Sequence, residues 1–249
     1  FVIPSVAMMI FTSIYGVVDG LFVSNFVGKT PFAAVNFIMP FCMILGAFGF
    51  MFGTGGTALV AKTLGEGKEE KANQIFSLLI YVALAVGILL ALFGIVFVEP
   101  IALKLGAEAS LLEYCVIYTR VVLLGLPFFM LQNMFQSFLI AAEKPKMGLV
   151  VTIAAGVTNM VLDALFIAVF RWGVVGAAAA TALSQFVGGM VPFLFFARKN
   201  SSKLHLTKTK IMGKELLRTC TNGSSELMSN LSMSLVSMLY NLQLIKYAG

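Results

Sequence analysis

Asn159 and Asp163 are the residues of this sequence whose types and spacing point most directly to chemistry. They lie four residues apart in an apolar stretch, 148–170, that is long enough to cross a bilayer. On a helix this spacing places an amide and a carboxylate on one face. A carboxylate at the centre of a spanning helix costs about 2.5 to 3.5 kcal/mol, so it normally faces protein or water rather than lipid. We therefore expect this face to line a functional cavity, with walls supplied by the rest of the chain.

The composition indicates a membrane protein built from helices. Hydrophobic residues make up 59% of the 249 positions and charged residues only 11%. The apolar runs are about 20 residues or longer, and the period-two alternation of an outer-membrane barrel is missing. The predicted fold class is therefore all-α, a polytopic helical membrane protein. The three cysteines lie in separate segments without metal-binding spacing, so we expect neither a disulfide nor a cysteine metal site.

Seven apolar segments are predicted as spanning helices. The second and fourth exceed the ~20 residues that a span requires, which predicts tilting or extension beyond the bilayer. Because both ends of the sequence lie in or beside apolar runs, we expect the chain to be a piece of a longer protein. The segments are 1–26, 32–61, 72–98, 111–141, 147–170, 174–197 and 216–247.

Lysine and arginine residues are distributed unevenly between the connections. Of the 17, twelve lie in or beside the connections after segments two, four and six, and only three in the others. The positive-inside rule then places the even-numbered connections in the cytoplasm of a multi-pass cell-membrane protein. The net charge of +6 thus reflects topology, and we expect no nucleic-acid partner. We also expect no nucleotide, because Gly65-Glu66-Gly67-Lys68 lacks the rest of a phosphate loop.

Four polar side chains from four segments are predicted to lie at one depth. About seven residues separate each of these side chains from the predicted outer end of its segment, and they are Asp19, Tyr118, Asp163 and Thr181. At 1.5 Å per residue this corresponds to about 10 Å below the outer surface, with Asn159 one turn deeper. The sequence therefore predicts a single site formed by these five residues.

This set has three interpretations. It could be a purely structural set of hydrogen bonds that hold the helices together (polar glue), each worth about 1 kcal/mol. Two carboxylates exceed what glue requires, however, and a buried carboxylate beside a second one can take up and release a proton. The oxygens could equally coordinate Na⁺, with Asp19, Asn159 and Asp163 as ligands. No other metal and no cofactor is expected, so the coupling ion would be H⁺ or Na⁺.

Two further charged residues have open roles. Arg120 lies two residues past Tyr118 and is either a counter-ion for one carboxylate or a side chain that extends to the interface. Glu226 falls near mid-membrane if the last segment starts at 216, and at the interface if that segment starts later. We interpret the pairs Gly16-x3-Gly20 and Gly49-x3-Gly53 as helix-packing motifs.

Several short motifs together resemble the multidrug and toxic compound extrusion (MATE) family. Asp19-Gly20-Leu21-Phe22-Val23, followed by Gly28 and Pro40, is similar to the first hairpin of that family. The resemblance continues through the segments Gly56 to Lys62, Asn159-x3-Asp163 and Gly176 to Thr181. It covers the first six predicted helices and is specific in combination.

The resemblance implies an architecture and a set of site residues. The chain would be the six-helix N-lobe of a two-lobed, twelve-helix transporter plus the first helix of the second lobe. The lobe would span 1–197, a cytoplasmic basic connection 198–215, and the seventh transmembrane helix 216–249. The family's cation and proton site would then fall on the same five residues, Pro4 on the bend of the first helix, and Glu226 on an acidic position of the second lobe.

The function hypothesis is an H⁺- or Na⁺-coupled antiporter that exports amphipathic or cationic organic compounds. The expected partners are small organic substrates and the lipid bilayer, and we expect the full-length protein to act as a monomer. One alternative is a lipid-linked oligosaccharide flippase of the same superfamily, which would need more cationic groups in its cavity. An intramembrane aspartyl protease is disfavoured because no Gly-x-Gly-Asp is present. A non-catalytic membrane scaffold would leave the carboxylates unexplained.

Overall fold

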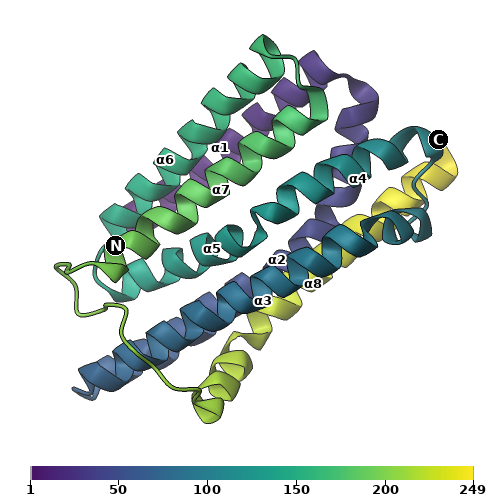
Figure 1. Cartoon of the computed structure of the whole chain (residues 1–249). Coiled ribbons are helices and arrows are strands. Elements are labelled where there is room, and N and C mark those ends of the chain that lie inside the picture. Colours follow the sequence, from purple (N-terminus) through teal and green to yellow (C-terminus); the bar gives the residue numbers. More distant parts are fainter. Residues whose placement is uncertain (1, 249) are drawn as a thin grey trace.

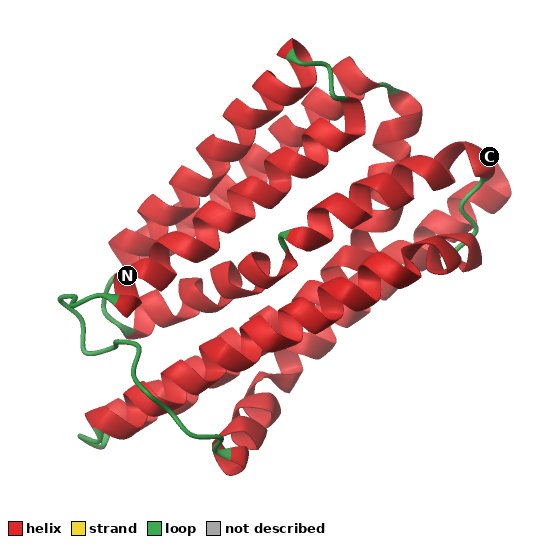
Figure 2. Ribbon diagram, in the orientation of Figure 1, coloured by secondary structure: helices red, strands yellow, loops and turns green. Residues whose placement is uncertain are grey.

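The computed structural model describes residues 2–248, with side chains described for 6–243 except Met9. This part of the chain is all-helical, which confirms the predicted fold class, and Figure 2 shows loops mainly at the two ends of the bundle. Two of the helices continue into short π-helical turns, labelled η. The elements are α1 (Val2–Phe22), η1 (Val23–Val27), α2 (Lys29–Gly65), α3 (Glu69–Lys104), α4 (Ala109–Leu124), α5 (Leu126–Ala141), α6 (Pro145–Asp163), η2 (Ala164–Val169), α7 (Gly173–Ala197) and α8 (Gly213–Ala248).

Among the described residues, five helical stretches are long and apolar enough to cross a membrane. A sixth arises if α4 and α5 count as one bent span. Helix α8 has the length of a span, with 36 residues, but its many serines and asparagines make it too polar to qualify on composition. Its role as the seventh transmembrane helix therefore stays a prediction.

The fourth predicted segment is not one tilted helix but two helices joined at a bend. Helices α4 and α5 meet at Gly125 with an angle of 56° between them. Pro127 lies two residues after Gly125, and because it has no N–H it cannot donate to the carbonyl of Leu123 as a continuous helix requires. The Gly125 N–H instead donates to the carbonyl of Val122 at 2.9 Å and ends α4. The extra length of this segment is thus taken up by bending.

Helix α2 lies at the centre of the lower part of the bundle in Figure 1, in contact with α3, α4, α5 and α8. A Cβ added at Gly49 would lie 2.7 Å from the Cα of Met130, so the glycine at this position lets α2 approach the backbone of α5. Gly53 is similarly close to α5, which confirms the predicted packing role of this pair. The same prediction is wrong for Gly16, because a Cβ there would meet nothing within 4 Å among the described atoms.

Helices α1, α6 and α7 form a second group, which Figure 1 shows above α4 and α5. Helix α6 packs against both α1 and α7, while α7 also contacts α4 and α5. Helix α1 therefore joins the bundle mainly through α6. This places the C-terminal part of α1 near α4, α6 and α7, where the predicted polar side chains converge.

The connection between α7 and α8, residues 198–212, packs on the N-terminal end of α3 and is called the strap. The side chain of Asn73, only 2% exposed, donates to the carbonyl of Lys203 at 3.1 Å and accepts from the N–H of His205 at 2.9 Å. Ser77 Oγ accepts from the N–H of Thr207 at 2.8 Å. Each bond joins a buried side chain of α3 to strap backbone, so the strap's path is fixed by α3.

Removing the Asn73 side chain is expected to release this strap. In Asn73→Ala, two backbone groups of the strap would lose their partners, at a cost of about 1 to 3 kcal/mol. We expect trypsin to cleave the full-length variant faster than the wild type at Lys203 and Lys208. Mass spectrometry of the fragments would measure the cleavage rate at each site. Gln74→Ala is the matched control, because the hydrogen bond between Gln74 and the strap is made by its backbone carbonyl, which the substitution keeps. Equal cleavage rates in both variants and wild type would show that Asn73 does not hold the strap.

Candidate functional site

Asp19 and Asp163 lie beside each other at the contact between α1 and α6. Asp163 is the last residue of α6 and is completely buried, while Asp19 on α1 is partly buried. The two carboxyl groups are close enough to interact electrostatically. Such a pair cannot hold two negative charges in a buried site at low cost, so the arrangement favours binding of a cation or proton between them.

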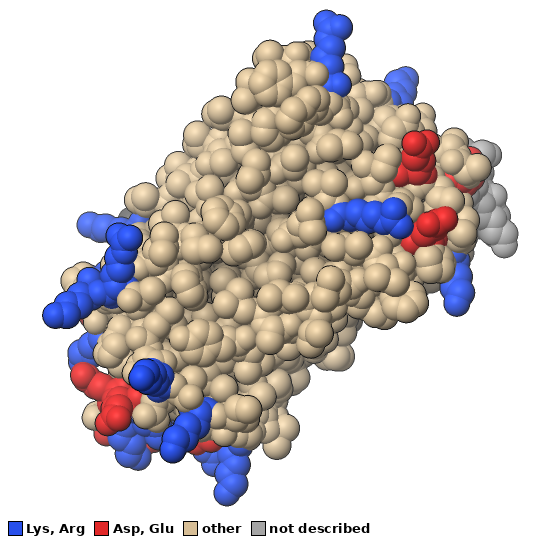
Figure 3. Space-filling model, in the orientation of Figure 1, with Lys and Arg blue, Asp and Glu red and all other residues tan. Residues whose placement is uncertain are grey.

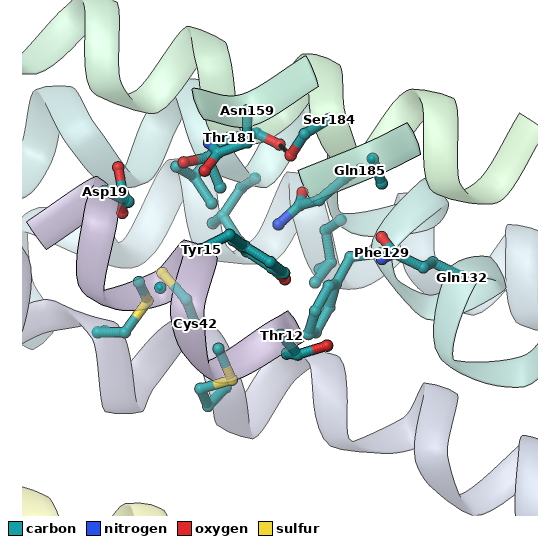
Figure 4. Close-up of a pocket in the computed structure, with 17 residues that line it drawn as sticks. Thr12, Tyr15, Asp19, Cys42, Phe129, Gln132, Asn159, Thr181, Ser184 and Gln185 are labelled. Atoms are coloured by element: carbon teal, nitrogen blue, oxygen red, sulfur yellow. Dashed lines mark hydrogen bonds between the residues drawn. The ribbon is translucent and has the colours of Figure 1, made fainter. Parts of the chain in front are cut away.

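The other three predicted residues surround this pair. Tyr118 on α4 is 1% exposed and interacts with both carboxylates, and Thr181 on α7 lies beside it. Asn159, 2% exposed, lies one turn before Asp163 and lines a cavity together with Asp19 and Thr181. Figure 4 shows Asn159 and Thr181 next to each other and Asp19 apart from them on α1. The structure thus brings the five predicted residues together from α1, α4, α6 and α7.

Several oxygens in this cluster are buried without a hydrogen-bond partner among the described atoms. They are Asp19 Oδ1, the Tyr118 hydroxyl, Asn159 Oδ1 and both carboxylate oxygens of Asp163. Buried acceptors are normally satisfied, and one left alone costs about 1 to 3 kcal/mol. A set made only of oxygens suits a hard monovalent cation or a proton. The residues present therefore fit H⁺ or Na⁺ at Asp19, Asn159 and Asp163.

A divalent-metal centre has no comparable basis. Within the residues whose placement is described, no three His, Cys, Asp or Glu side chains come together in a way that could hold a metal ion.

Both helices that carry the aspartates widen into a π-helical turn just beyond them. Helix α1 passes into η1 three residues after Asp19, and α6 passes into η2 directly after Asp163. The two turns also contact each other. A π-helical turn shifts the hydrogen-bond register from i−4 to i−5 and is frequent at functional sites. In this protein, a π-helical turn follows each of the two helices that carry an aspartate of the pair.

The cavity next to the pair has a volume of about 280 Å³ and is enclosed by side chains of α1, α2, α4, α5, α6 and α7 (Figure 4). Its wall combines apolar side chains with amides and hydroxyls. In Figure 4, Asp19 lies at one end of the view and Gln132 at the other. The lining residues are Thr12, Tyr15, Gly16, Asp19, Met39, Cys42, Met43, Val122, Leu123, Leu126, Phe129, Gln132, Ala155, Asn159, Thr181, Ser184 and Gln185.

Five polar residues of this wall were not predicted, and they are Thr12, Tyr15, Gln132, Ser184 and Gln185. Tyr15 and Gln185 follow the spacing that identified Asn159 and Asp163, because each lies one helical turn from a predicted residue: Asp19 and Thr181, respectively. Applying that rule to every predicted residue would have found both. Gln132 carries no such signal, since it enters the cavity only through the bend between α4 and α5.

Arg120 lies on the outside of the bundle rather than beside the aspartates. Its side chain is half exposed and its guanidinium lies 4.0 Å from the carboxylate of Glu99 on α3. It does not line the cavity. The counter-ion role is therefore not supported, because Arg120 points away from the site when α4 packs Tyr118 inward.

Glu226 and Pro4 lie apart from the cluster. Glu226 on α8 is partly buried and accepts a 3.4 Å hydrogen bond from Asn230, which lines a separate groove between α2 and α8. Its role as an acidic site of a second lobe stays a prediction. The side chain of Pro4 lies outside the described residues, so the predicted bend of the first helix at this residue stays a prediction as well.

The chain is similar to known membrane transporters over its whole length. The MatE family profile matches residues 4–165. The whole chain aligns with 55% of the multidrug export protein MepA from Staphylococcus haemolyticus at 28% identity, and with 55% of MepA from Staphylococcus aureus (strain MRSA252) at 27%. A solved MATE structure in the straight conformation superimposes with a TM-score of 0.89 at 25% identity, covering 98% of this chain and 55% of its own. The chain therefore spans about half the length of the relatives it matches.

Proposed function

This chain belongs to the MatE family of membrane transporters, and on that premise we propose that it is half of a cation-coupled antiporter. The full-length protein would export amphipathic or cationic organic compounds across the cytoplasmic membrane in exchange for H⁺ or Na⁺. The described helices would form the N-terminal lobe, 1–197, and α8 would begin the second lobe. The family consists of transporters rather than enzymes, so proteolysis by the aspartate pair is excluded.

The buried aspartate pair is the observation that carries this proposal. Structural glue between helices needs donors matched to acceptors, whereas five oxygens of the cluster have no partner among the described atoms. The cluster is instead suited to hold a cation that comes and goes. Coupling then requires only that the cation bind two arrangements of α1 and α6 with different affinity.

The cavity supplies a place for an organic substrate next to the cation site. Its volume of about 280 Å³ is close to the lower end of small-molecule pockets, and apolar walls with a few amides are typical of them. Asp19 belongs both to the carboxylate pair and to the cavity wall. A cationic substrate and the coupling ion would therefore compete for the same negative charge, which links import of one to export of the other.

The flippase alternative gains no support from this cavity. A lipid-linked pyrophosphate would need cationic groups, and none of the described lining residues is Lys or Arg. Arg120, the one candidate, pairs with Glu99 outside the bundle.

The orientation proposed from the basic connections agrees with the charge distribution. Figure 3 shows many Lys and Arg side chains at the end of the bundle that carries the α7–α8 strap. We propose that this end faces the cytoplasm, in accordance with the positive-inside rule. The aspartate pair then lies toward the outer half of the membrane.

Dye export under imposed gradients tests the proposed function. Cells making the full-length protein would be loaded with a fluorescent cationic dye and given an inward H⁺ gradient or an inward Na⁺ gradient. We expect one of these gradients to accelerate dye efflux above that of cells without the protein, which identifies the coupling ion. Efflux that neither gradient changes would contradict cation-coupled export.

A further inference from the structure

A basic groove lies where α7 ends and the strap begins. It is open to the surface, has a volume of about 500 Å³ and is lined by Arg198, Lys199, Asn200, Ser202 and His205 with the apolar side chains of Ala197 and Leu206. No acidic residue is found among these lining residues. The groove is separate from the aspartate cavity, with which it shares no residue.

The strap folds back on the last turn of α7 and fixes the shape of the groove. Asn200 Nδ2 donates to the carbonyls of Phe195 and Leu204 at 3.2 and 3.1 Å, and the N–H of Leu206 donates to the carbonyl of Phe196 at 2.8 Å. The free carbonyls at a helix C-terminus would otherwise repel an anion. Here donors from the strap occupy the carbonyls of Phe195 and Phe196, which leaves the basic side chains as the main source of charge in the groove.

Two buried contacts anchor the strap beneath the groove. Leu204 is completely buried, and the backbone of His205 is held by the side chain of Asn73 at 2.9 Å. The groove is consequently built on ordered backbone, although Arg198, Lys199 and His205 themselves are exposed. A preorganised site loses less entropy on binding than a disordered basic tail.

The basic residues of the groove are available for a ligand. Elsewhere on this end of the molecule, Lys203 lies 3.7 Å from Glu69 and Lys71 lies 3.0 Å from Glu215. Arg198 and Lys199 form no salt bridge with any described residue. Two unpaired cations and an imidazole that can donate a hydrogen bond are suited to a phosphate group.

Helix α7 is long enough to place the groove at the depth of lipid headgroups. Helix α7 has 25 residues, so it is about 37 Å long, compared with a hydrocarbon core of about 30 Å. Its last residue, Ala197, therefore lies at or just beyond the edge of the hydrocarbon, and Arg198 follows directly.

We propose that this groove binds the phosphate of an anionic phospholipid headgroup from the leaflet on the basic side. Arg198 and Lys199 would contact the phosphate, His205 would donate one hydrogen bond, and Ala197 and Leu206 would border the start of the acyl chains. Basic pockets at this level of a membrane protein are a known form of lipid recognition. The bound lipid would hold the strap, and through it the start of α8, against the membrane surface.

Lipid retention by the purified full-length protein tests this proposal. The protein in mixed micelles would be offered phosphatidylglycerol, phosphatidylcholine or inorganic phosphate, and bound lipid would be counted by native mass spectrometry. The double variant Arg198→Gln/Lys199→Gln is compared with Lys208→Gln/Lys210→Gln, which removes the same charge from exposed positions of the strap outside the groove. We expect the groove variant to bind phosphatidylglycerol on the order of tenfold more weakly and the control variant to match wild type.

Each other outcome overturns the proposal. Equal loss in the two variants would mean a general charge effect without a site. Equal retention of phosphatidylcholine would mean that anionic headgroups are not recognised. Displacement of phosphatidylglycerol by an equal concentration of inorganic phosphate would assign the groove to free phosphate instead. Thermal unfolding of both variants like wild type confirms that the comparison is between folded proteins.

Discussion

The Asp163→Asn variant of the full-length protein is expected to lose gradient-driven export, down to the level of cells without the protein. Asparagine has nearly the same shape as aspartate but carries no negative charge, so it cannot bind a proton or Na⁺ in exchange for substrate. A ligand that binds two conformations equally shifts neither, and the neutral variant would therefore leave the transport cycle uncoupled. The measurement is dye efflux under the gradient that drives the wild type.

A matched control separates this effect from a general loss of charge or folding. Glu113 on α4 is an exposed carboxylate outside the aspartate cavity, and Glu113→Gln is expected to export dye as the wild type does. Because the amide replaces a buried carboxylate without changing its volume, Asp163→Asn should also reach the membrane in normal amounts. Full export by Asp163→Asn would contradict the role of the pair.

Adding one methyl group where α2 crosses α8 is expected to have the second large effect. A Cβ at Gly223 on α8 would collide with the backbone of Met51 on α2, and a Cβ at Gly55 would collide with the backbone of Thr219 and Gly223. Backbone atoms cannot rotate away as a side chain can, so the helices must separate. We expect Gly223→Ala and Gly55→Ala each to lower the thermal stability of the purified full-length protein, with a cost of about 1 to 3 kcal/mol.

Each helix offers its own control for this prediction. A Cβ at Gly65 on α2 or at Gly213 on α8 would meet nothing within 4 Å among the described atoms. Gly65→Ala and Gly213→Ala should therefore leave the unfolding temperature unchanged or raise it slightly, since alanine favours helix. The two crossing variants act on one contact, so the double variant should cost less than the sum of the two. Unchanged stability in the crossing variants would mean that α8 does not pack on α2 in this way.

Most of the helices and their order could be predicted from the sequence because the signal is strong and local, although one predicted segment proved to be the two helices α4 and α5. Long apolar runs bounded by Gly, Pro and charged residues define helices such as α3 and α7 to within a few residues. Spacing on a helix likewise predicted that Asn159 and Asp163 share a face. Depth counting then brought Asp19, Tyr118 and Thr181 to the same place, and the structure brings these side chains together.

Other features depend on tertiary contacts that no local pattern encodes. The 56° bend at Gly125 depends on both the missing N–H of Pro127 and the packing of α5 against α2 and α7. The π-helical turns after the aspartates contain neither Pro nor Gly, so nothing in their composition marks them. The outward position of Arg120, by contrast, follows from helix geometry, because a residue two positions after the inward-facing Tyr118 lies on nearly the opposite side of α4.

The strap shows the same limit in a polar segment. Its composition indicates a solvated basic connection, but buried Asn73 and Ser77 on α3 hold its backbone in place. The partners are about 130 residues apart in sequence, and a single polar residue in an apolar helix does not reveal what it will contact. Such pairings emerge only when the helices are packed.

The most direct test of the central claim measures both fluxes in one system. Purified full-length protein would be reconstituted into vesicles, and the movement of a cationic dye would be recorded together with that of H⁺ and Na⁺. The account predicts that dye moving one way drives one of these ions the other way in wild type, and that Asp163→Asn and Asp19→Asn abolish this exchange while Glu113→Gln retains it. Dye movement in wild type without any counter-movement of H⁺ or Na⁺, or exchange that persists in both aspartate variants, would contradict a coupling site at the Asp19–Asp163 pair.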